Sequence, residues 1–175
     1  MKQFGTRQTF AIEIGGYQSP SSELRVVDVY ADGQFLTCDD NTVYLPAFIG
    51  ALQSDIQRMS ADHTPCHDAM PFETLSPIEN HRRLLADAET DNDLHLFHRF
   101  MDWGPTADNV SMHLFRIDDM AHIPFSFWRE THHDKRQLDQ VYCAQLPYLD
   151  LFAVIQDAVQ LLDQEWKTKR ASNGG

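Results

Sequence analysis

Hydrophobic and polar residues alternate along the first part of the chain. Phe10, Ile12 and Ile14 are separated by single residues, and this period of two is typical of a β-strand at residues 8–14. Further strands are predicted at residues 24–30, 34–38 and 42–45. Asp32 and Gly33 form a pair typical of a tight hairpin turn. The pattern therefore predicts an antiparallel β-meander.

Two longer segments have the period of an amphipathic helix. The first begins at Pro46, and its apolar face consists of Phe48, Ile49, Leu52, Ile56 and Met59. The second begins at Pro147, and its apolar face consists of Tyr148, Leu151, Phe152, Ile155, Ala158, Val159, Leu162 and Trp166. Each helix follows a predicted strand through a Leu-Pro pair, which indicates a weak repeat of architecture.

The second half of the chain resembles the first in its pattern. Ser76 and Pro77 are typical of a helix start, and strands are predicted at residues 94–103, 110–117, 123–129 and 141–146. The predicted fold is α+β: a mainly antiparallel sheet of two β-meanders, each followed by an amphipathic helix packed on the sheet. We predict a single domain at residues 1–166, whose pseudo-repeated halves, 1–60 and 90–166, are joined by residues 61–89. Residues 167–175 are predicted to be a disordered tail.

The net charge of the protein limits the kinds of molecule that it is expected to bind. Fourteen Lys and Arg against 26 Asp and Glu give a formal net charge of -12, which repels phosphate backbones and anionic lipid. We therefore expect neither nucleic-acid nor membrane binding. The charge suits a basic protein partner, although solubility alone is the alternative explanation. The absence of a long apolar run and of a signal segment predicts a cytoplasmic protein, and Cys38, Cys66 and Cys143 are expected to be reduced.

One histidine and cysteine cluster is a candidate metal site. His63, Cys66 and His67 are close in sequence, and His81 would complete a set of four soft ligands. This set motivates an alternative hypothesis, a small metal-dependent enzyme. The spacing matches no established zinc module, and the competing interpretation is a solvated loop. We therefore predict no metal and no other cofactor.

Catalytic signatures are absent from the sequence. His132, His133 and Asp134 have the residue types of a base with an orienting carboxylate, but the sequence indicates no positioned nucleophile beside them. Gly15 and Gly16 are not followed by the Lys-Ser or Lys-Thr of a phosphate-binding loop. We therefore predict no catalytic residues and a protein that is not an enzyme.

Two tryptophans and several acids remain as candidates for a partner-binding surface. Trp103 and Trp128 are amphipathic anchors of the kind found at interface centres, although the competing interpretation, that both lie in the core, is slightly favoured. The acidic candidates are Asp87, Glu89, Asp91, Asp93, Asp102, Asp108, Asp118 and Asp119. These ten residues are the predicted contact set.

A family resemblance agrees with a binding function. Phe4-Gly5, then 10–13 with the sequence Phe-Ala-Ile-Glu, an Asp-Gly hairpin and a Leu-Pro helix start resemble bacterial immunity proteins of polymorphic-toxin and contact-dependent growth inhibition systems. The resemblance covers residues 1–60 and, loosely, the closing helix. It implies a sheet packed by helices that binds and neutralises one cognate toxin domain, often a nuclease, without catalysis. An acidic chaperone for a secreted effector is a further alternative.

Overall fold

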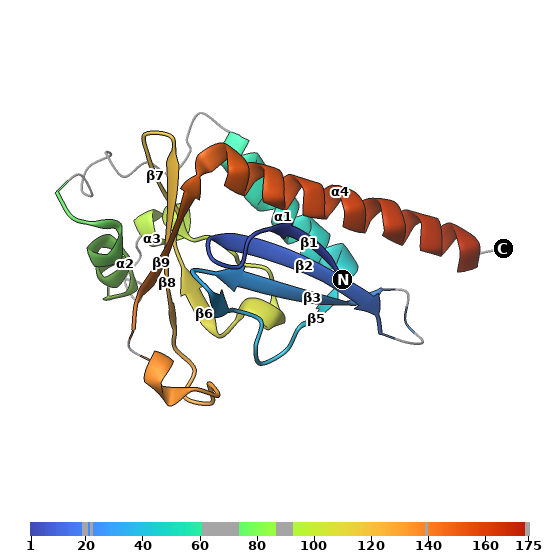
Figure 1. Cartoon of the computed structure of the whole chain (residues 1–175), viewed down its shortest axis with the longest axis horizontal. Helices are drawn as coiled ribbons and strands as arrows, with labels where there is room; N and C mark the ends of the chain where they lie inside the picture. The colour runs from blue at the N-terminus through green and yellow to red at the C-terminus, as the bar shows by residue number, and fades with distance from the viewer. Residues whose placement is uncertain (19–20, 22, 61–73, 87–92, 139, 174–175) are drawn as a thin grey trace.

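The computed structural model describes residues 1–18, 21, 23–60, 74–86, 93–138 and 140–173 (Figure 1). The strands are β1 (Lys2–Gly5), β2 (Phe10–Tyr17), β3 (Leu24–Ala31), β4 (Gln34–Phe35), β5 (Thr42–Tyr44), β6 (Val110–Met112), β7 (Phe115–Ile117), β8 (Met120–Phe127) and β9 (Tyr142–Pro147). The α-helices are α1 (Leu45–Ser60), α2 (Pro77–Ala86), α3 (Asp93–His98) and α4 (Tyr148–Asn173), and the short 3-10 helices are η1 (Pro105–Ala107) and η2 (Lys135–Gln137). None of the described helices combines the length and the apolar composition needed to span a membrane.

The first half of the chain forms an antiparallel sheet, which we call sheet A. Its strands follow the order β1-β2-β3-β4, and β5 pairs with the other end of β3. Asp32 and Gly33 both have positive φ, as the predicted hairpin turn between β3 and β4 requires. Gly5 ends β1 with a φ of 76°, and a Cβ there would lie 2.1 Å from the carbonyl oxygen of Phe10. Only glycine fits this close approach.

The second half forms a separate antiparallel sheet, sheet B. Strand β8 is central: β6 and β7 pair with its two ends along one side, and β9 pairs along the other. The predicted strand at residues 110–117 is therefore a broken edge strand, interrupted between β6 and β7. Figure 1 shows the strands of sheet B running across those of sheet A. The predicted α+β fold with two antiparallel meanders and packed helices is confirmed.

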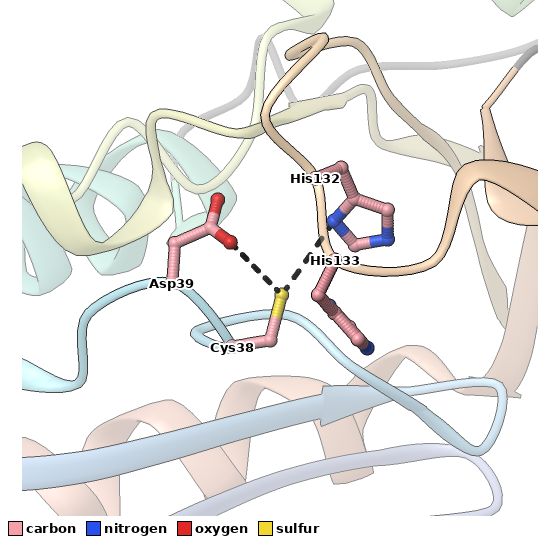
Figure 2. A group of neighbouring side chains, drawn as sticks. All are labelled: Cys38, Asp39, His132 and His133. Carbon is pink, nitrogen blue, oxygen red and sulfur yellow. Dashed lines mark hydrogen bonds between the residues drawn. The ribbon is translucent and has the colours of Figure 1, made fainter.

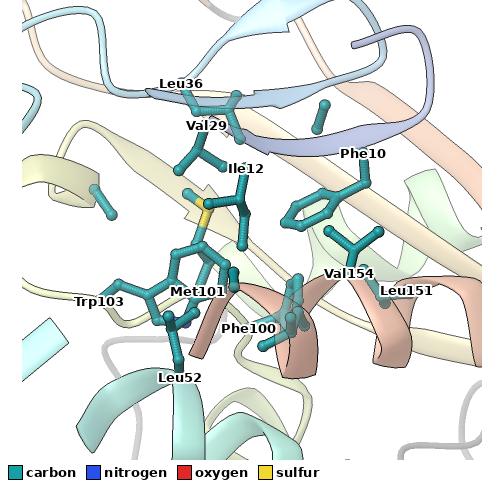
Figure 3. Close-up of a cluster of buried hydrophobic side chains, with 14 of the residues drawn as sticks. Phe10, Ile12, Val29, Leu36, Leu52, Phe100, Met101, Trp103, Leu151 and Val154 are labelled. Atoms are coloured by element: carbon teal, nitrogen blue, oxygen red, sulfur yellow. The ribbon is translucent and has the colours of Figure 1, made fainter. Parts of the chain in front are cut away.

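Helices α1 and α4 pack on each other and cover one face of sheet A (Figure 1). Figure 3 shows Phe10, Ile12 and Val29 pointing from sheet A toward Leu52 of α1 and Leu151 of α4. The buried cluster continues into sheet B through alternate residues of β8, which are Ala121, Ile123, Phe125 and Phe127. Both predicted amphipathic helices thus bury their apolar faces in a core that sheet A and sheet B share.

Two segment predictions were wrong. Residues 94–103 contain helix α3 and a loop in place of the predicted strand. The predicted disordered tail is helical as far as Asn173, because α4 continues beyond Trp166. Lys167 supports the extension through an ion pair of 2.6 Å with Asp163, one turn earlier. Residues 174–175 lie outside the described residues.

Candidate partner-binding surface

Three of the ten predicted contact residues meet at one cleft. Asp102, Asp108 and Trp128 line a cleft of about 430 Å³, together with Arg99 and Arg129. The indole of Trp128 is 59% exposed, so this side chain is available to a partner. Residues 99–108 and 128–129 come together here because β6 pairs with the end of β8 and the Trp128 amide donates to the Asn109 carbonyl oxygen at 3.3 Å.

Ion pairs form the rim of the cleft. Arg99 Nη2 lies 3.0 Å from Asp102 Oδ1, and Arg129 Nη2 lies 3.3 Å from Asp108 Oδ2. The guanidinium of Arg129 also sits over the Trp128 ring, 5.6 Å from its centroid. These pairs are solvent-exposed and contribute little to the stability of the fold. Their charges therefore remain available for recognition, and the rim is mixed rather than purely acidic.

An exposed apolar stripe on α3 extends this surface. Leu94, Leu96 and Phe97 are all exposed, with Leu96 at 61%. Leu96 lines a second shallow pocket together with Arg99 and Asp102, and these two residues also line the cleft. A continuous surface thus runs from Leu96 past the ion-paired rim to Trp128. We call these residues, Leu96, Phe97, Arg99, Asp102, Asp108, Trp128 and Arg129, the α3–Trp128 surface.

Trp103 lies in the core, which contradicts its prediction as a partner-binding residue. Only 4% of it is exposed, and its ring packs edge-on against Phe10 and Phe48. Its Nε1 donates a 2.7 Å hydrogen bond to Asp55 Oδ2, which also accepts a hydrogen bond from the Met101 amide. Burial raises the pKa of Asp55, while Arg58 and these donors oppose the shift. Trp103 therefore holds the cleft loop onto the core.

Strain is stored in the same loop. Met101 has a φ of 64°, in the left-handed region that a non-glycine residue seldom adopts. Its side chain is buried, and its amide is fixed on Asp55. Gly104, with a φ of 87°, turns the chain again before η1. The core thus presets the backbone on which Asp102 is presented.

The remaining acidic candidates lie elsewhere or outside the described residues. Asp118 and Asp119 form the turn between β7 and β8, and the Asp119 side chain is fully exposed. Trp128 follows the far end of β8, roughly 25–30 Å away at the rise of an extended strand. Asp93 begins α3, and Asp87, Glu89 and Asp91 lie outside the described residues. The acidic candidates within the described residues therefore do not form one patch.

A chain of imidazoles, which sequence reasoning missed, extends from the cleft into the protein. His95 lines the cleft, and its Nδ1 lies 3.1 Å from His113 Nε2. His113 Nδ1 lies 2.7 Å from His81 Nδ1, and His81 Nε2 lies 3.2 Å from the hydroxyl of Ser126. No spacing in the sequence indicates this row of imidazoles, because α2, α3 and sheet B each contribute to it.

These imidazoles are held neutral. Burial lowers the pKa of His81 to about 4, with Arg82 and His95 adding to the effect. Burial also places the pKa of His113 well below its usual range, and it lowers that of His95. Both His81 ring nitrogens have protein partners, so His81 is not free to join the candidate metal set considered above. His63, Cys66 and His67 lie outside the described residues.

The arrangement needed for the triad-like interpretation of residues 132–134 is not formed. Asp134 caps η2 and pairs with Arg136 at 2.8 Å, while His132 Nε2 lies 2.6 Å from Gln137 Oε1. The orienting group of His132 is therefore an amide. Arg136 lowers the pKa of Asp134 to about 2, which is typical of a paired surface carboxylate.

Comparison with known proteins identifies the fold. No protein-family profile and no curated protein sequence matches the chain. The structure is similar to the crystal structure of CdiI from Burkholderia dolosa AUO158, with a TM-score of 0.64 and 15% sequence identity. The alignment covers 91% of this chain and 99% of that chain. The chain therefore shares its fold with CdiI over nearly the whole length of both proteins.

Proposed function

We propose that this chain is an immunity protein of contact-dependent growth inhibition, which binds and neutralises one cognate toxin domain in the cytoplasm. The observation that carries the proposal is the likeness to CdiI across 91% of this chain and 99% of that one. CdiI proteins are immunity proteins that bind the toxin domain of the matching CdiA. The motifs in residues 1–60 point to the same class of protein.

Charge supports a basic partner. A toxin that cleaves nucleic acid needs a basic active site to hold phosphate, and a protein with a net charge of -12 approaches such a site quickly. Carboxylates at the interface then compete with the phosphate groups of the substrate. We propose that the toxin is a nuclease and that inhibition is stoichiometric, without any covalent step.

We place the contact on the α3–Trp128 surface. Exposed aromatic and apolar side chains are the usual source of binding energy, and Trp128, Leu96 and Phe97 are exposed there together. Asp102 and Asp108 stand between them on a loop that the core holds rigid. A preorganised surface loses little conformational entropy on binding, which favours high affinity.

Co-expression with the toxin domain encoded beside this gene tests the proposal. We expect the pair to rescue growth of cells that the toxin alone kills, and the purified proteins to form a one-to-one complex. The matched control is a toxin domain of another system, which should still kill. A neighbouring toxin that neither binds at micromolar concentration nor is neutralised would refute the immunity function, and a homodimeric protein in solution would favour the chaperone alternative.

Two charge-reversed proteins locate the contact. Asp102→Lys with Asp108→Lys changes the α3–Trp128 surface, and Asp118→Lys with Asp119→Lys changes the distant β7–β8 turn. Each pair raises the formal net charge from -12 to -8, so long-range attraction is matched. We expect both to slow association by a similar factor and only the first to accelerate dissociation as well.

Single substitutions sharpen the result. We expect Trp128→Ala to weaken toxin binding by at least about 30-fold, the threshold of an interface hot spot. Trp166→Phe, on α4 and outside the cleft, should leave the dissociation constant unchanged. If Trp128→Ala binds as tightly as the unaltered protein, the contact lies on another face while the immunity function itself stands.

A further inference from the structure

Four side chains with metal-binding atoms converge at a place that the proposed function does not use. Cys38 and Asp39 follow β4 in the first half, and His132 and His133 precede η2 in the second (Figure 2). One ligand atom from each of the four residues lies within 4.8 Å of all the others. His132 is buried, Cys38 is half-buried, and Asp39 and His133 are exposed, so the cluster opens to solvent on one side.

Two distances in the cluster are close to those between ligands of one ion. Cys38 Sγ lies 3.7 Å from His132 Nδ1 and 3.9 Å from Asp39 Oδ1 (Figure 2). In a tetrahedral zinc site, the bond lengths place sulfur and nitrogen or oxygen ligands about 3.5 Å apart. The two pairs therefore need to approach by only a few tenths of an ångström to share an ion.

The neighbours of His132 keep its Nδ1, the ring nitrogen near Cys38, unprotonated. Gln137 Nε2 donates to Gln34 Oε1 at 2.7 Å, which leaves Gln137 Oε1 to accept the proton of His132 Nε2 at 2.6 Å. The Asn109 amide fixes the same tautomer independently. Its Oδ1 accepts from the Arg129 amide at 3.0 Å, and its Nδ2 donates to His132 Nδ1 at 2.8 Å. A ligating histidine whose other nitrogen donates to a fixed oxygen is the arrangement of metal sites.

We propose that Cys38, Asp39, His132 and His133 bind one divalent transition-metal ion of the zinc class. A thiolate with two imidazoles selects such an ion over Mg²⁺ or Ca²⁺, which prefer oxygen ligands. Four protein ligands close a tetrahedral shell, so the site is structural and ties the segment after β4 to the segment before η2. The ion replaces the Asn109 donor at Nδ1 and displaces the thiol proton of Cys38. This inference does not rest on the immunity function.

Metal titration of the untagged, chelator-treated protein is the test. Co²⁺ reports the ligands directly, because a thiolate bound to cobalt gives an intense charge-transfer absorption. Zn²⁺ should then displace cobalt at one equivalent. We expect the absorption in the unaltered protein and in the control variants Cys143→Ser and Cys66→Ser, and its loss in Cys38→Ser.

The exposed ligand gives a second variant that keeps the fold intact. His133→Ala should weaken Zn²⁺ binding by about 10- to 100-fold. At a hundredfold excess of free Zn²⁺ over its dissociation constant, the Tm of the unaltered protein should rise by about 5–10 °C, and that of Cys38→Ser should not rise. Either of two results overturns the proposal: no cobalt–thiolate absorption at millimolar Co²⁺, or an absorption that survives in Cys38→Ser and disappears in Cys66→Ser.

Discussion

The two halves of the molecule bury different chemistry under their helices. On sheet A, α1 and α4 pack through hydrocarbon side chains, and we call this the hydrocarbon interface; Phe10 and Leu151 are typical members. On sheet B, α2 and α3 pack around buried imidazoles, and we call this the histidine interface; His81 and His113 are its centre. Among the described residues, only the second is built around imidazoles, which are neutral in the fold but take up protons near neutral pH when the chain unfolds. Lowering the pH should therefore weaken the histidine interface and leave the hydrocarbon interface unchanged.

Truncation of the hydrocarbon interface should have the largest effect. Phe10 is fully buried among other aromatic rings, so Phe10→Ala removes a large apolar area and leaves a cavity. We expect it to lower the free energy of unfolding by about 3–5 kcal/mol. Urea denaturation at pH 7.5 and pH 5 should give the same loss at both, because no titrating group is removed. A loss that differs by more than 1 kcal/mol between the two pH values would contradict this description of the interface.

The hydrocarbon interface has one polar anchor, and removing it should have the next largest effect. Trp103→Phe keeps most of the aromatic packing but removes the donor to Asp55. Asp55 keeps Arg58 at 2.6 Å and the Met101 amide at 3.3 Å. We expect a loss of about 1.5–3 kcal/mol, the value of a hydrogen bond to a charged group.

The matched control is the other candidate tryptophan. Trp128→Phe should change the free energy of unfolding by less than about 0.5 kcal/mol, because its side chain is exposed. Equal losses for the two substitutions would show that burial does not explain the difference between these tryptophans.

The histidine interface should weaken in acid. The pKa of His81 falls from its usual 6.5 to about 4 on folding, so the folded state favours the neutral ring. The free energy of unfolding is therefore not reduced by His81 above pH 6.5, and it decreases as the pH falls from 6.5 toward 4, because the unfolded chain binds the proton more tightly. For His81 alone, the loss between pH 7 and pH 5 is roughly 2 kcal/mol. The lowered pKa of His113 acts in the same direction.

His81→Gln isolates this contribution. Glutamine retains hydrogen-bonding groups but does not titrate, so the variant should lose less stability between pH 7 and pH 5 than the unaltered protein does. Both proteins should be denatured with urea at the same pH values. The contribution of the carboxylates, which the two proteins share, then cancels in the difference between their free energies of unfolding. Parallel curves for the two proteins would refute the assignment of the acid sensitivity to His81.

Sequence periodicity predicts one interface better than the other. Strand β2 and helices α1 and α4 were predictable because hydrocarbon burial requires a regular spacing of apolar residues. Residues 94–103 were mistaken for a strand because they carry apolar side chains on every side. In the structure Leu96 and Phe97 are exposed while Phe100 is buried, and no single period describes that change. The extension of α4 had a visible signal, the Asp163 and Lys167 spacing.

The candidate sites depend on contacts between residues remote in sequence. Cys38 and His132 are 94 residues apart, and His81 and Ser126 are 45 apart. Nothing in the local sequence indicates that such residues meet. Residue type marked Trp128 as a candidate anchor, but exposure is a property of the folded chain. The same argument selected Trp103, which the core buries.

The smallest effect is expected at the solvent end of the imidazole chain. His95 is half-buried at the cleft, so in His95→Ala a water molecule can replace the ring as the partner of His113 Nε2. We expect a loss of about 0.5–1 kcal/mol at pH 7.5. His113→Ala removes a fully buried ring and leaves a cavity that water from the cleft cannot reach. His81 Nδ1 then has no partner in that cavity. We therefore expect His113→Ala to lower the free energy of unfolding by at least about 3 kcal/mol. Urea denaturation of the two variants compares them directly. Similar losses would mean that the chain is equally sealed along its length, and the histidine interface would then be as closed to water as the hydrocarbon interface.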